Sequence, residues 1–204
     1  SLDLGRSASV DTTYVLTTIP AADPHNVLVE EFTGVKCSNC PAAHDVLEGL
    51  EHTYGTRLNV IGLYIYNFLQ TEKHHESVYD FRDSAATAIG QSVYKGVGRM
   101  PIGGVDRLPA GIEPPLLLQL NATQWTALID SRLTIPDSVN LKLESSYNST
   151  TGIATITATV IYTKPVSSTQ NLSMVIVEDS VIDAQEFPPT PFGPFVDGYD
   201  PEYE

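Results

Sequence analysis

The sequence predicts an α/β domain followed by a smaller antiparallel β domain of sandwich-like type. Two apolar runs, Val27 to Phe32 and Leu58 to Tyr66, have the nearly continuous hydrophobic pattern of strands covered on both faces. Residues at helical spacing separate them, and this order of strand, helix and strand predicts a parallel pair joined by a right-handed crossover. After Pro136, apolar residues alternate with Ser, Thr and Asn, which is typical of antiparallel strands.

The first helix is predicted to begin near Cys37 and to end at Gly55. Pro41 fixes its start, because proline is tolerated only in the first turn of a helix. Four apolar residues then share one helical face: Ala43, Val46, Leu47 and Leu50.

The remaining elements of the first domain follow in chain order. A second helix is predicted between Val78 and Tyr94, and a short strand opens at Met100-Pro101 and contains a glycine pair. Leu116 to Leu120 is short and apolar, and Thr123 to Leu133 is predicted to be a helix.

Three segments after Pro136 are predicted to be strands: Val139 to Tyr147, Ile153 to Tyr162 and Leu172 to Glu178. The residues from Asn148 to Gly152 form a hairpin loop between the first two. The acidic, proline-rich tail from Phe187 to Glu204 has no period and is predicted to be irregular.

These elements divide the 204 residues into an extension or tether (1–24), an α/β domain (25–136) and a β domain (137–204). The chain has 25 acidic and 11 basic residues, a net charge of -14, without a Lys/Arg cluster that would follow a phosphate backbone. Nucleic acid is therefore not an expected partner. Apolar runs all fall short of the roughly 20 residues that cross a bilayer.

Cys37 and Cys40 are the two cysteines of the chain. A Cys-x-x-Cys pair between a strand and a helix favours thiol-disulfide chemistry, because the helix N-terminus stabilises a thiolate. Cys37 is then expected to be an exposed nucleophile, and Cys40 resolves the mixed disulfide. Lys36 adds positive charge, although solvent screens it.

Two other interpretations of the cysteine pair stay open. Cys37, Cys40 and His44 have the spacing C-x2-C-x3-H, so His74 or His75 would complete a zinc site, although adjacent histidines in a polar loop are more often solvated. Alternatively the pair is an inert local disulfide, which stabilises little because its loop is short.

The arrangement from Val27 to Asp106 resembles the thioredoxin fold. That resemblance implies that Pro101 is cis and packs against the cysteines, and that the backbone of Met100 pairs with an extended peptide. It also places a buried, proton-accepting acid at Glu31, six residues before Cys37. Alternation in the strand predicts instead that at least one of Glu30 and Glu31 faces water.

The sequence departs from thioredoxin itself around the cysteines. Ser38-Asn39 stands where thioredoxin has Gly-Pro, and Lys36 stands where it has tryptophan. Lys36, Ser38 and Asn39 are expected to contact the substrate, but the reduction potential is not transferred. His44 follows Cys40 on the same helical face and either tunes the pair or is a surface histidine.

A closer resemblance is to the thioredoxin-like outer-membrane-protein-twenty-eight family of Gram-negative bacteria. Three blocks carry it: VLVEEFTGVKCSNCPAAH, GVGRMPIGGVDR and LSMVIVEDSVIDAQ. The resemblance implies a lipoprotein of the cell envelope, in the periplasm or outer membrane. A membrane contact would come only from an N-terminal lipid anchor outside this chain. The family also implies a further strand beyond the tail, so that the β domain would be truncated here.

The expected function is thiol-disulfide exchange on protein cysteines, with protein thiols or disulfides as partners. No cofactor is required beyond the redox-active disulfide, and no metal is expected. The alternative is a surface binding or adhesion lipoprotein in which the thioredoxin-like part is a scaffold.

Overall fold

The computed structural model describes residues 20–108, 117–118, 122–179, 181–186 and 197–198. These residues belong to two compact units. The sheet unit holds the described residues of 24–136 and 171–204, and the hairpin unit holds those of 1–23 and 137–170. The predicted extension up to residue 19, and the predicted tail except for 197–198, lie outside the described residues.

A four-stranded mixed sheet forms the centre of the sheet unit, in the order β2-β1-β3-β4. β1 (Val27–Phe32) pairs in parallel with β2 (Leu58–Leu63) and antiparallel with β3 (Ile102–Val105). β4 (Leu117–Leu118) pairs antiparallel with β3. The parallel pair confirms the predicted strand, helix and strand, and the inner position of β1 explains its long buried run.

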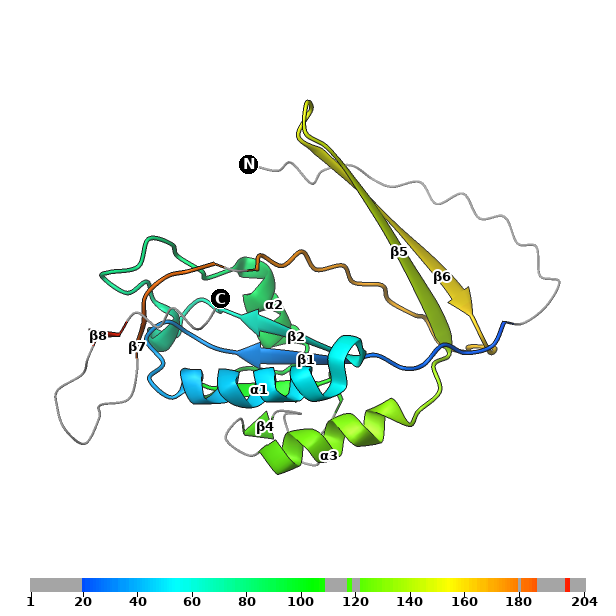
Figure 1. Cartoon of the computed structure of the whole chain (residues 1–204), viewed down its shortest axis with the longest axis horizontal. Coiled ribbons are helices and arrows are strands. Elements are labelled where there is room, and N and C mark those ends of the chain that lie inside the picture. Colours follow the sequence, from blue (N-terminus) through cyan, green and yellow to red (C-terminus); the bar gives the residue numbers. More distant parts are fainter. Residues whose placement is uncertain (1–19, 109–116, 119–121, 180, 187–196, 199–204) are drawn as a thin grey trace. The chain divides into compact units, whose positions relative to one another are not determined.

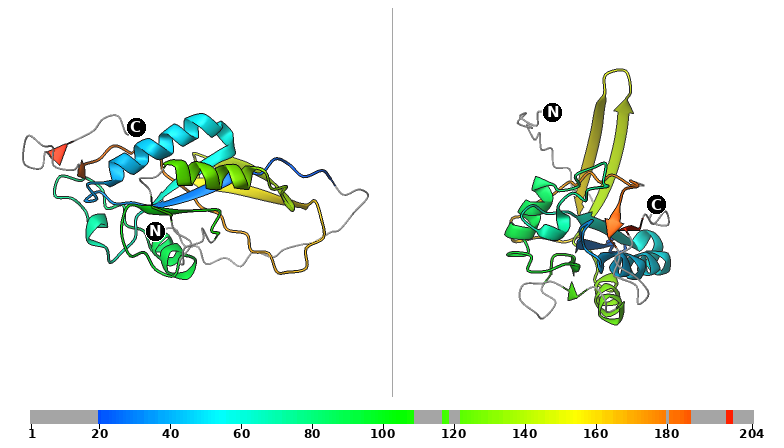
Figure 2. Two further views of the ribbon diagram at one scale, coloured as in Figure 1. Left: turned by 90° about the horizontal axis from the view of Figure 1, so that it is seen from below. Right: turned by 90° about the vertical axis from the view of Figure 1, so that its left-hand side faces the viewer.

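Helices cover both faces of this sheet (Figures 1 and 2). α1 (Cys40–Tyr54) and α3 (Ala122–Leu133) pack on one face, and α2 (Ser84–Ser92) lies on the other. Short 3₁₀ turns, η1 (Gly55–Arg57) and η2 (Leu69–Thr71), lie on either side of β2 in the chain. The α1 and α3 face buries Val27, Val29, Leu47, Leu50, Leu58, Val105, Trp125 and Ile129. The α2 face buries Phe32, Leu63, Ile65, Ala86, Tyr94 and Ile102.

The hairpin unit is a long antiparallel ribbon of β5 (Val139–Asn148) and β6 (Ile153–Tyr162). Both strands and the loop between them confirm the prediction, and Gly152 supplies the positive φ of +68° that the loop requires. A sandwich-like arrangement is not seen among the described residues. Both strands are exposed along most of their length, because the described ribbon has no second sheet to pack against.

Three expectations differ from the structure. The strand predicted at Leu172 to Glu178 is not observed, because this segment pairs with no strand among the described residues. The helix predicted between Val78 and Tyr94 is shorter than that range and covers only α2. It begins at Ser84, because Asp83 caps its N-terminus by accepting a hydrogen bond from Ala86 N at 2.7 Å. Residues 171–186 belong to the sheet unit rather than with β5 and β6.

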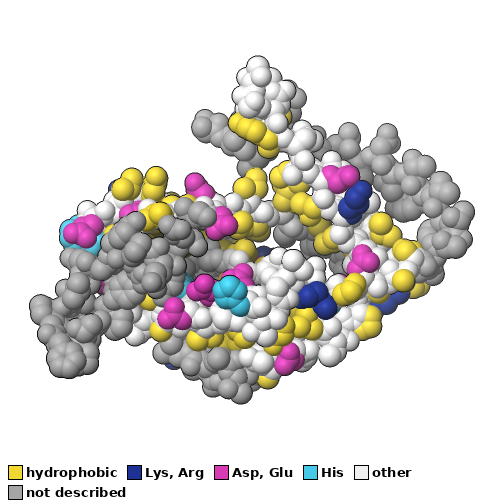
Figure 3. Space-filling view, viewed as in Figure 1, with side chains coloured by type: hydrophobic (Ala, Val, Ile, Leu, Met, Phe, Trp, Pro, Cys, Tyr) yellow, Lys and Arg dark blue, Asp and Glu magenta, His cyan; other side chains and the backbone are white. Residues whose placement is uncertain are grey.

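The described surface is mixed and acidic. On the face shown in Figure 3, Asp and Glu side chains are scattered among hydrophobic ones. Among the described residues, no helix has the length and hydrophobicity to cross a membrane.

Candidate functional site

The cysteine pair lies directly after the central strand, at the start of α1. Cys37 and Cys40 form a disulfide with their Cα atoms 5.3 Å apart. The turn between them is closed by Cys40 N, which donates to Cys37 O at 2.9 Å. The helix therefore begins at Cys40, three residues later than predicted, with Pro41 in its first turn. This places the disulfide beside the unpaired backbone N–H groups of a helix N-terminus, which favour a thiolate.

The cysteines are more buried than a freely accessible nucleophile would be. Cys37 is 3% exposed and Cys40 is fully buried. The expectation that Cys37 is exposed is therefore wrong. A segment distant in sequence lies against the same turn, since Gln185 Nε2 donates to Cys37 O at 3.2 Å.

Glu31 is buried and lies beside a histidine of α1. Its side chain is 3% exposed, and its Oε2 is 3.3 Å from Nε2 of His44. Thr33 Oγ1 is 2.9 Å from the same nitrogen. Oε1 of Glu31 is buried without a hydrogen-bond partner among the described residues. A buried carboxylate oxygen without a hydrogen-bond partner is costly, so the contact of Oε2 with His44 is the main compensation for burying this side chain.

The charge of Glu31 also acts on its neighbours. Burial, and then the charge of Glu31, raise the pKa of Tyr64 to about 12. Burial alone would lower the pKa of His44, but the hydrogen bond and charge of Glu31, with the charge of Asp45, raise it above 6.5 overall. His44 is therefore bound to an acid and is not a plain surface histidine.

Replacing His44 by glutamine is expected to remove a pH-dependent contribution to the stability of the fold. Because the folded pKa of His44 lies above 6.5, the folded chain binds the proton more tightly than the unfolded chain. The contribution is thus fully present below about pH 6.5 and is lost as pH rises through the folded pKa. Urea unfolding of both proteins across this window measures it. His52→Gln, on the exposed side of the same helix, is the control; a pH-independent difference for His44→Gln would contradict the assignment.

Glu30 forms a second buried acid site on the opposite face of β1. It is fully buried and receives two hydrogen bonds from Arg107, at 2.5 and 2.9 Å, and one from Tyr94 Oη at 2.7 Å. Neither Glu30 nor Glu31 faces water, so that interpretation of the strand alternation is wrong. Both acids are tolerated because each has a charged or polar partner. Burial and the charge of Glu30 raise the pKa of Tyr94.

Sequence reasoning missed Arg107 and Tyr94 in this network. They lie 77 and 64 residues from Glu30, and nothing local in the sequence connects them to it. An arginine directly after the strand that opens at Pro101 is the one available signal.

Met100 and Pro101 lie at the cysteine end of the sheet. The peptide bond between them is cis, as the resemblance implied. Because Phe32 pairs with Ile102 in an antiparallel register, the start of β3 lies beside the end of β1, from which the cysteine loop leaves. Pro101 is buried, and Met100 packs against the α2 face core.

Lys36, Ser38 and Asn39 lie next to the cysteines in sequence and are all at least partly exposed. Lys36 Nζ lies 3.5 Å from Glu72 Oε2 in a partly exposed ion pair, so Glu72 partly compensates the charge of Lys36. Asn39 is exposed and precedes α1 without a side-chain cap, and Ser38 is half-buried.

The zinc interpretation does not gather its expected ligands. The disulfide uses both cysteine sulfurs, and His44 contacts Glu31 and Thr33. Among the described residues, the group with metal-ligand spacing is His74, His75 and Glu76, with ligand atoms within 4.8 Å of one another. His74 is only 6% exposed, contrary to a solvated histidine, and its Nδ1 accepts from Glu76 N.

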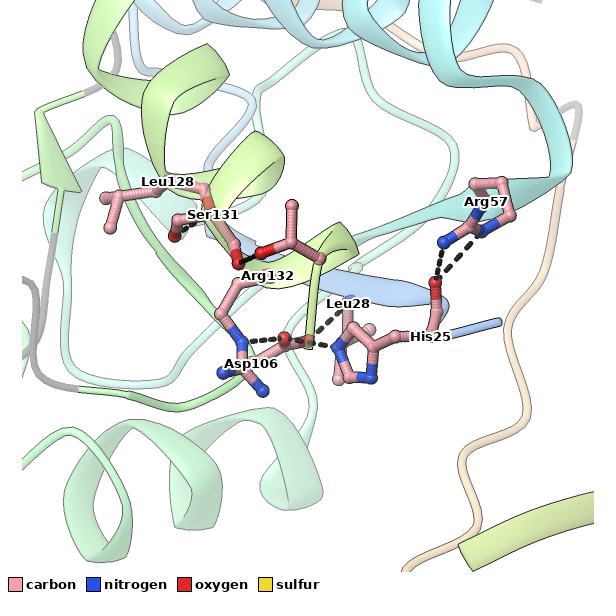
Figure 4. A network of polar contacts seen from close by, with 8 residues as sticks. His25, Leu28, Arg57, Asp106, Leu128, Ser131 and Arg132 are labelled. Atoms are coloured by element: carbon pink, nitrogen blue, oxygen red, sulfur yellow. Dashed lines mark hydrogen bonds and ion pairs between the residues drawn. The ribbon is translucent and has the colours of Figure 1, made fainter. Parts of the chain in front are cut away.

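A network of polar contacts lies at the end of β1 opposite to the cysteines and holds that end of the sheet in place (Figure 4). Asp106 accepts from Leu28 N at 2.9 Å and from Arg132 Nε at 2.6 Å, and it contacts His25 Nε2 at 2.8 Å. Arg57 donates to His25 O. The network joins the end of β3, the start of β1 and α3, and it is structural.

Comparison with known proteins identifies no family. No model of a known protein family matches the chain, and no curated protein matches it. A crystal structure from a structural genomics consortium, of a protein from Agrobacterium tumefaciens, is similar at 15% identity with a TM-score of 0.40. The match covers 63% of this chain and 55% of that protein, so it spans little more than half the length of the Agrobacterium protein.

Proposed function

We propose that the chain is a thioredoxin-like thiol-disulfide oxidoreductase that acts through Cys37 and Cys40. The observation that carries the proposal is the disulfide at the N-terminus of α1, directly after the central strand. The strand order β2-β1-β3-β4, with β3 antiparallel to β1, supports a thioredoxin-like sheet. The three blocks VLVEEFTGVKCSNCPAAH, GVGRMPIGGVDR and LSMVIVEDSVIDAQ support membership of the outer-membrane-protein-twenty-eight family.

The exchange needs only sulfur chemistry and protons. A partner thiolate attacks Sγ of Cys37; a mixed disulfide forms, the Cys37–Cys40 bond breaks, and Cys40 leaves with the electron pair and takes a proton. A second partner thiolate then attacks the partner sulfur of the mixed disulfide, and Cys37 leaves as a thiolate. The partner dithiol is oxidised to a disulfide and the cysteine pair is reduced. The reverse sequence, with Cys37 attacking and Cys40 resolving, reduces a partner disulfide.

The surrounding residues have distinct roles in this proposal. Glu31, buried beneath α1 with one unsatisfied oxygen, takes or returns the proton of Cys40. Met100 and Pro101 border the groove in which an extended peptide of the partner lies. Lys36, Ser38 and Asn39 lie next to the cysteines in sequence and contact the same peptide.

The setting proposed for this activity is the cell envelope, in the periplasm or outer membrane. An oxidising compartment suits a protein whose two cysteines pair with each other. Protein thiols or disulfides are the partners, and the disulfide itself is the redox group.

Turnover of a disulfide-bonded protein tests the proposal. The pre-reduced chain is expected to accelerate reduction of insulin disulfides by dithiothreitol by at least about 100-fold over a sample whose two thiols were alkylated first. Precipitation of the freed insulin chains reports the rate. Equal rates for the native and alkylated samples would reject the enzyme.

The exposed ribbon favours a second candidate, a binding or adhesion protein. Large apolar side chains stand exposed on β5 and β6, including Leu141, Leu143, Tyr147, Ile153 and Val160. Exposed apolar surface of this kind often marks an interaction site. If this is the main function, alkylating the cysteines leaves partner binding intact while Leu143→Ser weakens it.

A further inference from the structure

A short segment from far along the chain is hydrogen-bonded to the loop that carries the disulfide. We call residues Asp183–Glu186 the strap; β7 (Gln185–Glu186) is its last part, and β8 (Asp197–Gly198) pairs with it. Figure 1 shows this orange segment descending beside the loop that leaves β1. The strap is half-buried and belongs to the sheet unit.

The strap contacts three carbonyl groups around Cys37. Glu186 N donates to Val35 O at 2.8 Å, as a neighbouring β-strand would. Gln185 Nε2 lies 3.3 Å from Gly34 O and 3.2 Å from Cys37 O. The loop therefore presents acceptors, and the strap supplies the donors.

The other end of the strap is tied to the loop before α2. The carboxylate of Asp183 accepts from Val78 N at 2.9 Å and from Tyr79 N at 2.8 Å. Glu186 Oε1 also lies 3.8 Å from Nε2 of the buried His74. All these contacts are polar. A competing peptide can replace hydrogen bonds with its own, whereas a buried apolar side chain would first have to be pulled out of the core.

Two observations together indicate what the strap does. Cys37 is only 3% exposed although its chemistry needs an approaching sulfur, and the strap occupies the backbone acceptors of the same turn. An extended peptide that approaches Cys37 through those acceptors competes for them with the strap.

We propose that the strap is an internal occupant of the peptide-binding face of the disulfide loop. Its competitor is an extended protein segment that offers a backbone N–H to Val35 O and a donor side chain to Gly34 O and Cys37 O. This inference rests on the proposed function, and it names the substrate class and a regulation of the same site. Because the loop offers acceptors and the chain carries a net charge of -14, amide or basic side chains fit there and acidic ones do not.

The rate at which a phosphine reduces the Cys37–Cys40 disulfide tests the strap without requiring enzymatic activity. Asp183→Ala and Gln185→Ala each remove two contacts that hold the strap to other loops. Each is expected to speed reduction about fivefold to tenfold, and the double variant more. Gln170→Ala is the matched control, since among the described residues the side-chain amide of Gln170 contacts Ser168, which lies in the hairpin unit.

The outcomes separate the strap from the proposed function. Faster phosphine reduction without insulin turnover supports the strap and rejects the enzyme. Unchanged phosphine reduction in a chain that does turn over insulin overturns the strap. Hydrogen exchange of the wild-type chain tests the strap even if a variant misfolds. The backbone amides of Val78, Tyr79 and Glu186 donate the hydrogen bonds that hold the strap, so they are expected to exchange slowly. Fast exchange at these amides would overturn the proposal.

Peptide selectivity tests the substrate class separately. Three disulfide-linked peptides that differ only in the residue next to the cysteine are compared: glutamine, lysine or glutamate. The glutamine and lysine peptides are expected to react with the reduced chain about fivefold faster than the glutamate peptide. Gln185→Ala should raise all three rates and keep their order. Equal rates for the three peptides would overturn the assigned substrate class.

Discussion

Replacing Cys37 by serine is expected to lower thiol-disulfide exchange by a factor of at least about 10³, as loss of a covalent nucleophile does. Replacing Cys40 by serine should instead trap the partner, because Cys37 still attacks but nothing releases the mixed disulfide. The geometry assigns these roles. Cys40 is fully buried at the first residue of α1, whereas Cys37 lies in the turn before the helix, where the strap touches its carbonyl group.

Mass spectrometry of the trapped adduct distinguishes the two cysteines. With a disulfide-bonded protein as partner, Cys40→Ser should accumulate an adduct through Cys37 and Cys37→Ser should accumulate little. His52→Gln is the matched control, because it changes an exposed residue at the far end of α1 and keeps both sulfurs. An adduct that forms mainly with Cys37→Ser would reverse the assigned roles.

Local sequence was sufficient to predict that the cysteine pair lies between the end of a strand and the start of a helix. The strand before Cys37 is defined by its apolar run, and Pro41 limits where α1 can begin. The strands β5 and β6 were predictable for the same reason, since their alternation and the loop at Gly152 act over a few residues. The parallel pairing of β1 and β2 followed from the order of the elements.

The environment of the pair was not predictable, because it depends on contacts across the chain. Gln185 lies 148 residues from Cys37. The alternation before it, at Leu172 to Glu178, predicted a strand, but this segment has no strand partner among the described residues. Strand propensity is realised only when a neighbouring strand is available. The burial of Glu30 likewise depends on its hydrogen bond with Arg107, which is distant in sequence. Alternation alone therefore predicted a solvent-facing acid, whereas the structure buries Glu30 in the core.

Replacing Arg107 by alanine is expected to destabilise the fold by about 3 kcal/mol, because it leaves the charge of Glu30 buried without its cation. The value is at the lower end for a buried pair, since the side chain of Arg107 is 28% exposed while that of Glu30 is fully buried. Glu30→Gln should cost less, because the arginine left behind still reaches water. Urea unfolding followed by circular dichroism gives the free energies.

The double variant Glu30→Gln/Arg107→Ala tests whether the loss of stability comes from the unpaired charge of Glu30. If the uncompensated carboxylate causes the loss, adding Glu30→Gln to Arg107→Ala should recover part of the stability, because the buried charge is gone and Tyr94 keeps a polar partner. Arg82→Ala is the matched control, since that arginine pairs with the exposed Asp80 and should leave the unfolding midpoint nearly unchanged. The assignment fails if Arg107→Ala is as mild as the control, or if the double variant is less stable than Arg107→Ala alone.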